Sequence, residues 1–242
     1  MGKKFLAIII LVILTACTEE PVIVKSDAPP DAPEQKPEIV EQQTDDEEEV
    51  EEFIEFALPE EKIMVNLKMV PILDSYLQAV PNRQKAIGQM TLDPIQATDK
   101  NLYMLAFSCR ETACSYLLMD RTEENKTYLL ADLAELSQTV LSPDGTNVMF
   151  HFTREESPSH LPLSDIVVID LEKWEPMTPD HLQADSFALS YTWPIQFVEW
   201  TDNRNLTATV PDISEPSAEK IMAWANTEKP TKTIELTLNP KE

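Results

Sequence analysis

Three stretches of the chain repeat the same pattern of hydrophobic and polar positions. They cover residues 105–133, 138–171 and 197–238. Each has an apolar run, a short polar turn, a second apolar run, a loop and a third run rich in aliphatic and β-branched residues. In the middle stretch, Asp144-Gly145 supplies the positive-φ position that a tight hairpin turn needs. The pattern predicts a mainly β (α+β) fold over residues 101–242, built from antiparallel hairpins.

A helical period precedes these strands. Between residues 59 and 80, hydrophobic side chains recur at spacings of three and four, which predicts one apolar helix face formed by Ile63, Leu67, Val70, Leu73, Leu77 and Val80. Pro71 interrupts this face, and proline suits the first turn of a helix better than its interior. We therefore expect residues 58–100 to form short helices followed by a polar connection.

The first residues have the parts of a secretory signal peptide. Lys3 and Lys4 precede an apolar run of ten residues, 5–14, and small residues follow. Ten apolar residues are too few for a membrane-spanning helix, which needs about 20. Leu14-Thr15-Ala16-Cys17 resembles the bacterial lipobox, which implies cleavage after residues 1–16 and a lipid on Cys17. The alternative is an ordinary cleaved signal followed by an incidental cysteine.

The segment after Cys17 is strongly acidic. Residues 18–57 contain fifteen acidic residues, two lysines and five prolines, a net charge of −13. Such a composition cannot bury enough apolar surface to offset chain entropy, so we expect residues 17–57 to form a disordered tether. An alternative is that the acidic run 45–52 binds cations or a basic partner. The whole chain carries a net charge of −24, which is unfavourable for binding nucleic acid.

The middle hairpin resembles a known repeat. Ser142-Pro143-Asp144-Gly145 lies between apolar strands, and residues 165–171 read Asp-Ile-Val-Val-Ile-Asp-Leu. This resembles the TolB-type (WD40-like) β-propeller repeat, while the turns at residues 108–111 and 201–204 match it less well. The resemblance implies binding of another envelope protein. Three repeats are too few to close a propeller, so either the N-terminal part adds a blade-like unit or the hairpins form an open or sandwich-like assembly.

Two cysteines and one tryptophan are further candidate residues. Cys109 and Cys114 flank a predicted hairpin turn, and in an exported protein this spacing favours a disulfide over two free thiols. Trp193, which precedes a proline, is the best candidate among the four tryptophans for an exposed stacking surface.

Signatures of catalysis are scarce. Three glycines cannot build a phosphate loop or a nucleophile elbow, and the three histidines stand in no metal-binding pattern, so we predict no cofactor and no metal site. His151 alternates with Phe150 and Phe152, which places it on the opposite strand face, exposed to solvent or in a local hydrogen bond. We expect a non-catalytic lipoprotein on the extracytoplasmic face of a membrane, binding a protein or cell-wall partner. The alternatives are a wall-glycan hydrolase with paired carboxylates and a small-ligand sensor.

Overall fold

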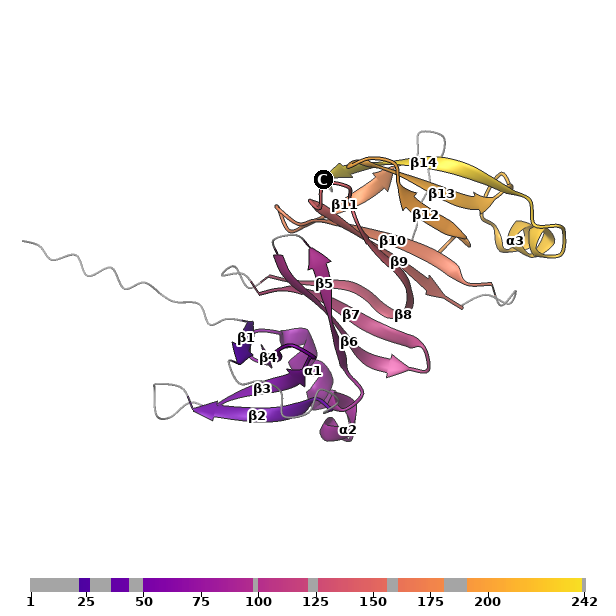
Figure 1. Ribbon diagram of the computed structural model, residues 1–242. Helices are drawn as coiled ribbons and strands as arrows, with labels where there is room; N and C mark the ends of the chain where they lie inside the picture. Colours follow the sequence, from indigo (N-terminus) through magenta and orange to yellow (C-terminus); the bar gives the residue numbers. More distant parts are fainter. Residues whose placement is uncertain are drawn as a thin grey trace, which may run out of the picture.

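The computed structural model describes residues 22–26, 36–43, 50–97, 100–121, 126–155, 161–180 and 191–240. The fold is mainly β, as the hydrophobic pattern predicts, with a four-stranded and a ten-stranded antiparallel sheet (Figure 1). The signal peptide of residues 1–16 and the lipidation site Cys17 lie outside the described residues.

The smaller sheet has the strand order β1-β4-β3-β2, and two helices follow it in the chain. Its elements are β1 (Ile23–Ser26), β2 (Glu38–Gln43), β3 (Val50–Ala57), β4 (Lys62–Asn66), α1 (Pro71–Ala79) and α2 (Arg83–Ile87). The larger sheet has the order β12-β13-β14-β11-β10-β9-β8-β7-β6-β5. Its strands and the third helix are β5 (Thr91–Ala97), β6 (Lys100–Arg110), β7 (Ala113–Asp120), β8 (Thr127–Leu141), β9 (Asn147–Arg154), β10 (Leu163–Asp170), β11 (Glu175–Asp180), β12 (Phe197–Trp200), β13 (Asn205–Pro211), α3 (Ala218–Ala225) and β14 (Thr231–Pro240).

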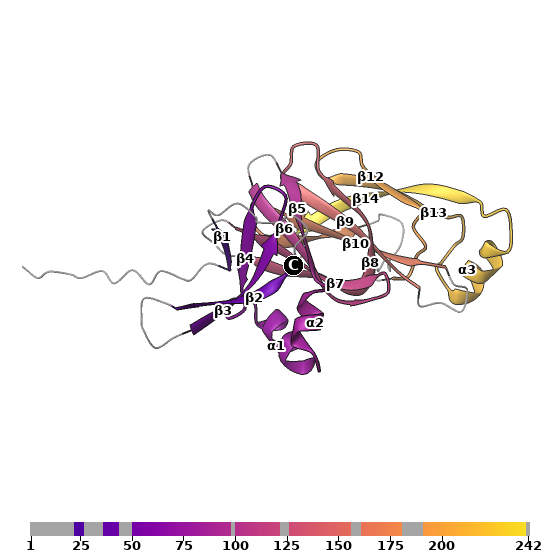
Figure 2. The ribbon, with the colours of Figure 1, turned by 60° about the horizontal axis from the view of Figure 1, so that its bottom comes forward.

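The long strand β8 takes part in two layers. Its first half, up to Ala134, pairs with β7, and its second half, from Glu135, pairs with β9. Leu133, just before the change of partner, has a φ of 48°. The ten-stranded sheet therefore turns back on itself, so that β9 and β10 lie over β6 and β7 (Figures 1 and 2).

The core between these two layers is aromatic and aliphatic. Side chains of β6 and β7, including Tyr116 and Leu118, pack in one cluster with Phe150 and Phe152 of β9. The rings of Tyr116 and Phe152 lie 5.3 Å apart between centroids. This face of each strand carries every second residue, as period-two alternation requires.

Two further cores complete a stack of four layers. The smaller sheet, with α1 and α2, packs on the other face of β5–β7, where Ile54, Ile63 and Leu105 are fully buried. The other face of β9 and β10 packs under β12–β14, where Met149 and Val168 contact the cluster that contains Leu236. The stack is open in Figure 1, with the β1–β4 layer at one end and β12–β14 at the other. The N-terminal strands thus supply an additional layer, and the hairpins form an open stack.

The prediction of a disordered tether over residues 17–57 is wrong for the described parts of that range. Strands β1, β2 and β3 lie there, and Phe53, Ile54 and Phe56 are buried. The acidic residues of β3 form ion pairs with cations that come later in the chain. Glu55 lies 3.1 Å from the Lys62 ammonium, and Glu52 accepts two hydrogen bonds from the Arg83 guanidinium.

The prediction of short helices over residues 58–100 is correct only in part. Helix α1 begins at Pro71, where the pattern placed a helix start. However, Ile63 and its neighbours form β4 rather than a helix, because the strand lies between β1 and β3 with four consecutive buried residues. The expected polar connection contains α2 and β5. The boundary drawn at residue 100 also separates β5 from its hairpin partner β6.

A polar cluster around Glu61 joins the first layer to the second. Glu61, in the β3–β4 turn, accepts a 2.7 Å hydrogen bond from the Tyr103 hydroxyl of β6 and lies 3.0 Å from the Lys25 ammonium of β1. Burial alone would raise the pKa of Glu61, but the hydrogen bonds from Tyr103 and Lys25 lower it overall. Burial and the Glu61 carboxylate raise the pKa of Tyr103 to about 12. This cluster therefore ties the N-terminal strands to the larger sheet.

The layered core makes a direct prediction about stability. Phe150→Ala should lower the free energy of unfolding by about 3–5 kcal/mol, because Phe150 is fully buried and its removal leaves a cavity between two layers. The matched control is Phe197→Ala, since Phe197 is 51% exposed and should change stability by no more than about 0.5 kcal/mol. Urea unfolding of both variants measures the difference. Equal losses in the two variants would contradict the described packing.

Candidate functional site

Three tight turns lie side by side where β9 begins and β10 ends. They are the β8–β9 turn at residues 142–146, the β10–β11 turn at residues 171–174 and the β12–β13 turn at residues 201–204. Although they are distant in sequence, hydrogen bonds join them. The Leu171 amide donates to the Thr146 carbonyl at 2.8 Å, and the Asp144 amide donates to Asn203 Oδ1 at 3.1 Å.

The β8–β9 turn contains the segment Ser142-Pro143-Asp144-Gly145. Ser142 and Asn147 close the hairpin through a 2.8 Å backbone bond, and Gly145 has the positive φ of 73° that the sequence predicts. Asp144 Oδ1 accepts hydrogen bonds from the Ser142 hydroxyl at 2.7 Å and from the amide and hydroxyl of Thr146 at 3.0 and 2.9 Å. The Ser142 bond is the largest of the causes that lower the pKa of Asp144.

The other two turns use an aspartate in the same way. Asp170 Oδ1 accepts the amides of Glu172 and Lys173, both at 2.9 Å. Asp202 Oδ1 accepts the amides of Arg204 and Asn205 at 2.7 and 2.9 Å. Because Asp170 and Asp202 each accept the amides two and three residues further along, and Asp144 accepts the Thr146 amide, hydrogen bonds fix the backbone of each turn.

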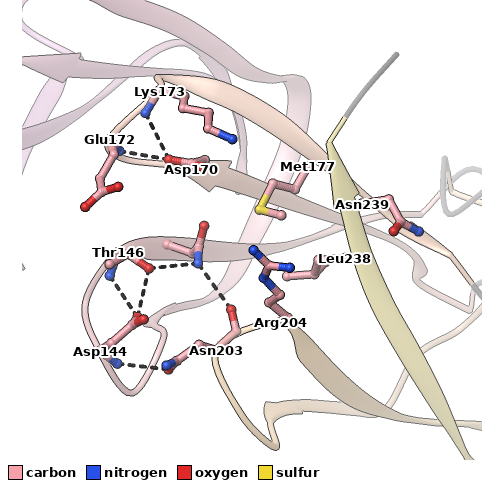
Figure 3. Close-up of a pocket in the computed structure, with 11 residues that line it drawn as sticks. Asp144, Thr146, Asp170, Glu172, Lys173, Met177, Asn203, Arg204, Leu238 and Asn239 are labelled. Carbon is pink, nitrogen blue, oxygen red and sulfur yellow. Dashed lines mark hydrogen bonds between the residues drawn. The ribbon is translucent and has the colours of Figure 1, made fainter.

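The turns surround a polar cavity of about 420 Å³, which we call the turn-end cavity (Figure 3). It is lined by Asp144, Thr146, Asn147, Asp170, Glu172, Lys173, Met177, Asn203, Arg204, Leu238 and Asn239. The volume is typical of sites for small molecules or for one group of a larger partner. The described lining contains no aromatic ring, so stacking on a sugar is not the chemistry that this cavity offers.

Two cations, Lys173 and Arg204, line this cavity. Among the described residues, neither the Lys173 ammonium nor the Arg204 guanidinium forms an ion pair. Their backbones are held in place, since the Lys173 and Arg204 amides donate to Asp170 and Asp202, and the Arg204 carbonyl accepts the Leu238 amide at 2.8 Å. Figure 3 shows Glu172 and Lys173 pointing in opposite directions from their turn.

A second hollow, wider and shallower, lies between β8, β9 and α3. Its volume is about 740 Å³, and its lining includes His151, Phe197 and Trp224. His151 Nε2 lies 3.0 Å from Ser164 Oγ, but this pair is not arranged as a catalytic dyad. Ser164 is fully buried, and its hydroxyl also accepts the Ile195 amide at 3.1 Å. The pair therefore attaches the segment after residue 190 to β9 and β10.

The cysteine, tryptophan and histidine candidates lie apart from the turn-end cavity. Cys109 and Cys114 form a disulfide across the β6–β7 hairpin, with Cα atoms 4.0 Å apart. The prediction that Trp193 forms an exposed binding surface is wrong: Trp193 is 5% exposed, bridges to Ser164 and packs in the core below β12–β14. His151 lies on the face opposite Phe150 and Phe152 and makes a local hydrogen bond rather than facing solvent.

Neither Lys173 nor Arg204 was identified from the sequence. The available signal is weak: each cation follows an aspartate by two or three residues, and only Arg204 lies in a turn that the sequence predicts. Among the described residues, no group of three or more His, Cys, Asp or Glu is arranged to hold a metal ion. No helix in that part of the chain has the length and apolar character that crossing a membrane requires. No protein-family model, curated protein or solved structure matches the chain.

The buried His151 predicts a pH dependence of stability. Burial lowers the pKa of His151 below the ordinary value of 6.5, so the unfolded state binds more protons than the folded state in weakly acidic solution. The free energy of unfolding should therefore fall as the pH drops from about 7 through 6.5 towards the folded pKa. Chemical unfolding between pH 7.5 and 5 checks this, with His151→Gln as the comparison. A wild-type slope equal to that of His151→Gln would contradict a buried neutral imidazole.

Proposed function

We propose that the chain is a bacterial lipoprotein that is exported, held by a lipid on Cys17 at the outer face of a membrane, and bound through its β-rich domain to an envelope partner. The partner, a protein or a cell-wall component, would contact the turn-end cavity. The observation that carries this proposal is the joining of three fixed turns around one polar cavity.

The anchoring part rests on the leader. A basic start, ten apolar residues and Leu14-Thr15-Ala16-Cys17 together resemble the lipobox. The first strand begins at Ile23, six residues after Cys17, so a lipid there would hold the β1–β4 layer close to the bilayer. The turn-end cavity belongs to the layers of β9–β10 and β12–β14, beyond the intervening layer of β5–β7 (Figure 1). That placement leaves the cavity accessible to a partner away from the membrane.

The binding part rests on preorganisation. Turns whose backbones are already hydrogen-bonded lose little conformational freedom when a partner docks, so less of the interaction energy is spent on ordering. Hydrolysis of a cell-wall glycan at the turn-end cavity is less well supported. A carboxyl that acts as general acid needs a raised pKa, and the hydrogen bonds to Asp144 lower its pKa. The cavity therefore suits recognition better than proton transfer.

The lipid anchor predicts the behaviour of a Cys17→Ser variant. In bacterial cells given radiolabelled palmitate, the wild-type chain should incorporate label and sediment with membranes. Cys17→Ser should incorporate none and move to the soluble fraction or remain uncleaved, because serine accepts no thioether-linked lipid. Cys114→Ser provides a control that alters a different cysteine and should still be labelled. Absence of label from the wild-type chain would contradict the anchoring proposal.

If the partner docks at the turn-end cavity, a bulky side chain at the edge of the cavity should block it. Glu172 is exposed at the edge of the cavity, and Glu172→Trp should block a partner without disturbing the core. On native gels of mildly solubilised membranes, the wild-type chain should migrate in a complex larger than itself, and Glu172→Trp should migrate alone.

The matched control is Glu219→Trp, which makes the same change at an exposed position of α3 and should leave the complex intact. A complex that survives Glu172→Trp but is lost in Glu219→Trp would assign docking to the α3 side instead.

A further inference from the structure

We propose that the turn-end cavity binds an oxyanion, a carboxylate or phosphate group of the partner, between Lys173 and Arg204. This inference rests on the proposed function, since it specifies what the partner offers to the cavity.

Lys173 and Arg204 come from different turns, β10–β11 and β12–β13, and line the same cavity. Figure 3 shows both side chains extending toward Met177 from their separate walls. An ammonium and a guanidinium around one cavity can share an anionic group, and the guanidinium fork matches two oxygens of a carboxylate or phosphate.

Two carboxylates that line the turn-end cavity, those of Asp144 and Asp170, are engaged within their own turns. Asp170 is hydrogen-bonded to the Glu172 and Lys173 amides, and Asp144 accepts three bonds within its own turn. Glu172 points away from Lys173 in Figure 3. Asp144 and Asp170 therefore hold the turns, and among the described residues no carboxylate forms an ion pair with Lys173 or Arg204.

Ion pairing alone does not set Lys173 and Arg204 apart from the other cations. Lys25, Lys62 and Arg83 lie beside carboxylates, but among the described residues Lys85, Arg110 and Lys229 form no ion pair either. What distinguishes Lys173 and Arg204 is that both line one cavity, where they can bind the same external anion. Asn203 adds a polar wall, because its side-chain oxygen already accepts the Asp144 amide and its amide group stays available as a donor within the described structure.

The test monitors anion binding to the full-length chain in detergent micelles by two-dimensional amide NMR at constant ionic strength. Inorganic phosphate and acetate are titrated separately, so that phosphate and carboxylate recognition are distinguished. Saturable shifts of the Lys173, Arg204 and Thr146 amides are expected with at least one probe. Arg204→Gln and Lys173→Gln should each weaken the affinity about tenfold or more. Lys229→Gln, at the second hollow, should leave the affinity unchanged.

Absence of saturable shifts with both probes would overturn the inference, as would shifts that persist unchanged in Arg204→Gln. This failure is distinguishable from failure of the proposed function. If Glu172→Trp abolishes the complex seen on native gels but neither probe binds, the partner docks without an oxyanion. If the probes bind and the wild-type chain forms no complex, the cavity takes a free anion and the docking proposal fails.

Discussion

One strand, β8, must satisfy two pairing partners, and the arrangement of the layers depends on this constraint. Its first half pairs with β7 and its second half with β9, with Leu133 held at a positive φ before the change. Such a conformation costs a non-glycine residue about 1–3 kcal/mol. Burial of Phe150, Phe152 and the side chains of β6 and β7 offsets that cost, because each fully buried large side chain contributes about 1.5–3 kcal/mol. The bend therefore exists because it brings two apolar faces together.

The turn-end cavity is a second consequence of sheet curvature. Strand β11 pairs with β14 at the far end of the chain, so the sheet folds over and β12–β14 cover the outer face of β9 and β10. This fold-over brings the turn at Asp144 next to Asn203, which is 59 residues away in sequence. Because the carboxylates of all three turns hold backbone amides, the cations beside them are left facing the cavity. The hydrogen bonds that fix the turns thus determine which charged groups face a partner.

Local patterns predicted the hairpins well because a hairpin's strands and turn lie within one short segment. Ser142 to Gly145 carried its own turn signal, and the mainly β fold follows from such segments. The N-terminal strands were missed because the average charge of residues 18–57 hides the alternation of Phe53, Ile54 and Phe56 with acids whose cations come later, at Lys62 and Arg83. The prediction that Trp193 is exposed was wrong because a tryptophan before a proline gives no information about the strand that packs over it. Lys173 and Arg204 could not be paired from sequence, because only the fold-over unites their turns.

Contact between the partner and the turn-end cavity is tested most directly by site-specific photo-cross-linking in intact bacterial cells. A photoreactive amino acid would replace Asn239 at the cavity in one chain and Met222, 40% exposed on α3, in another. A discrete cross-linked product of the chain is expected from the Asn239 position and none from the Met222 position. A product from Met222 with none from Asn239 would contradict contact at the cavity, because the partner would then contact helix α3 and not the three turns.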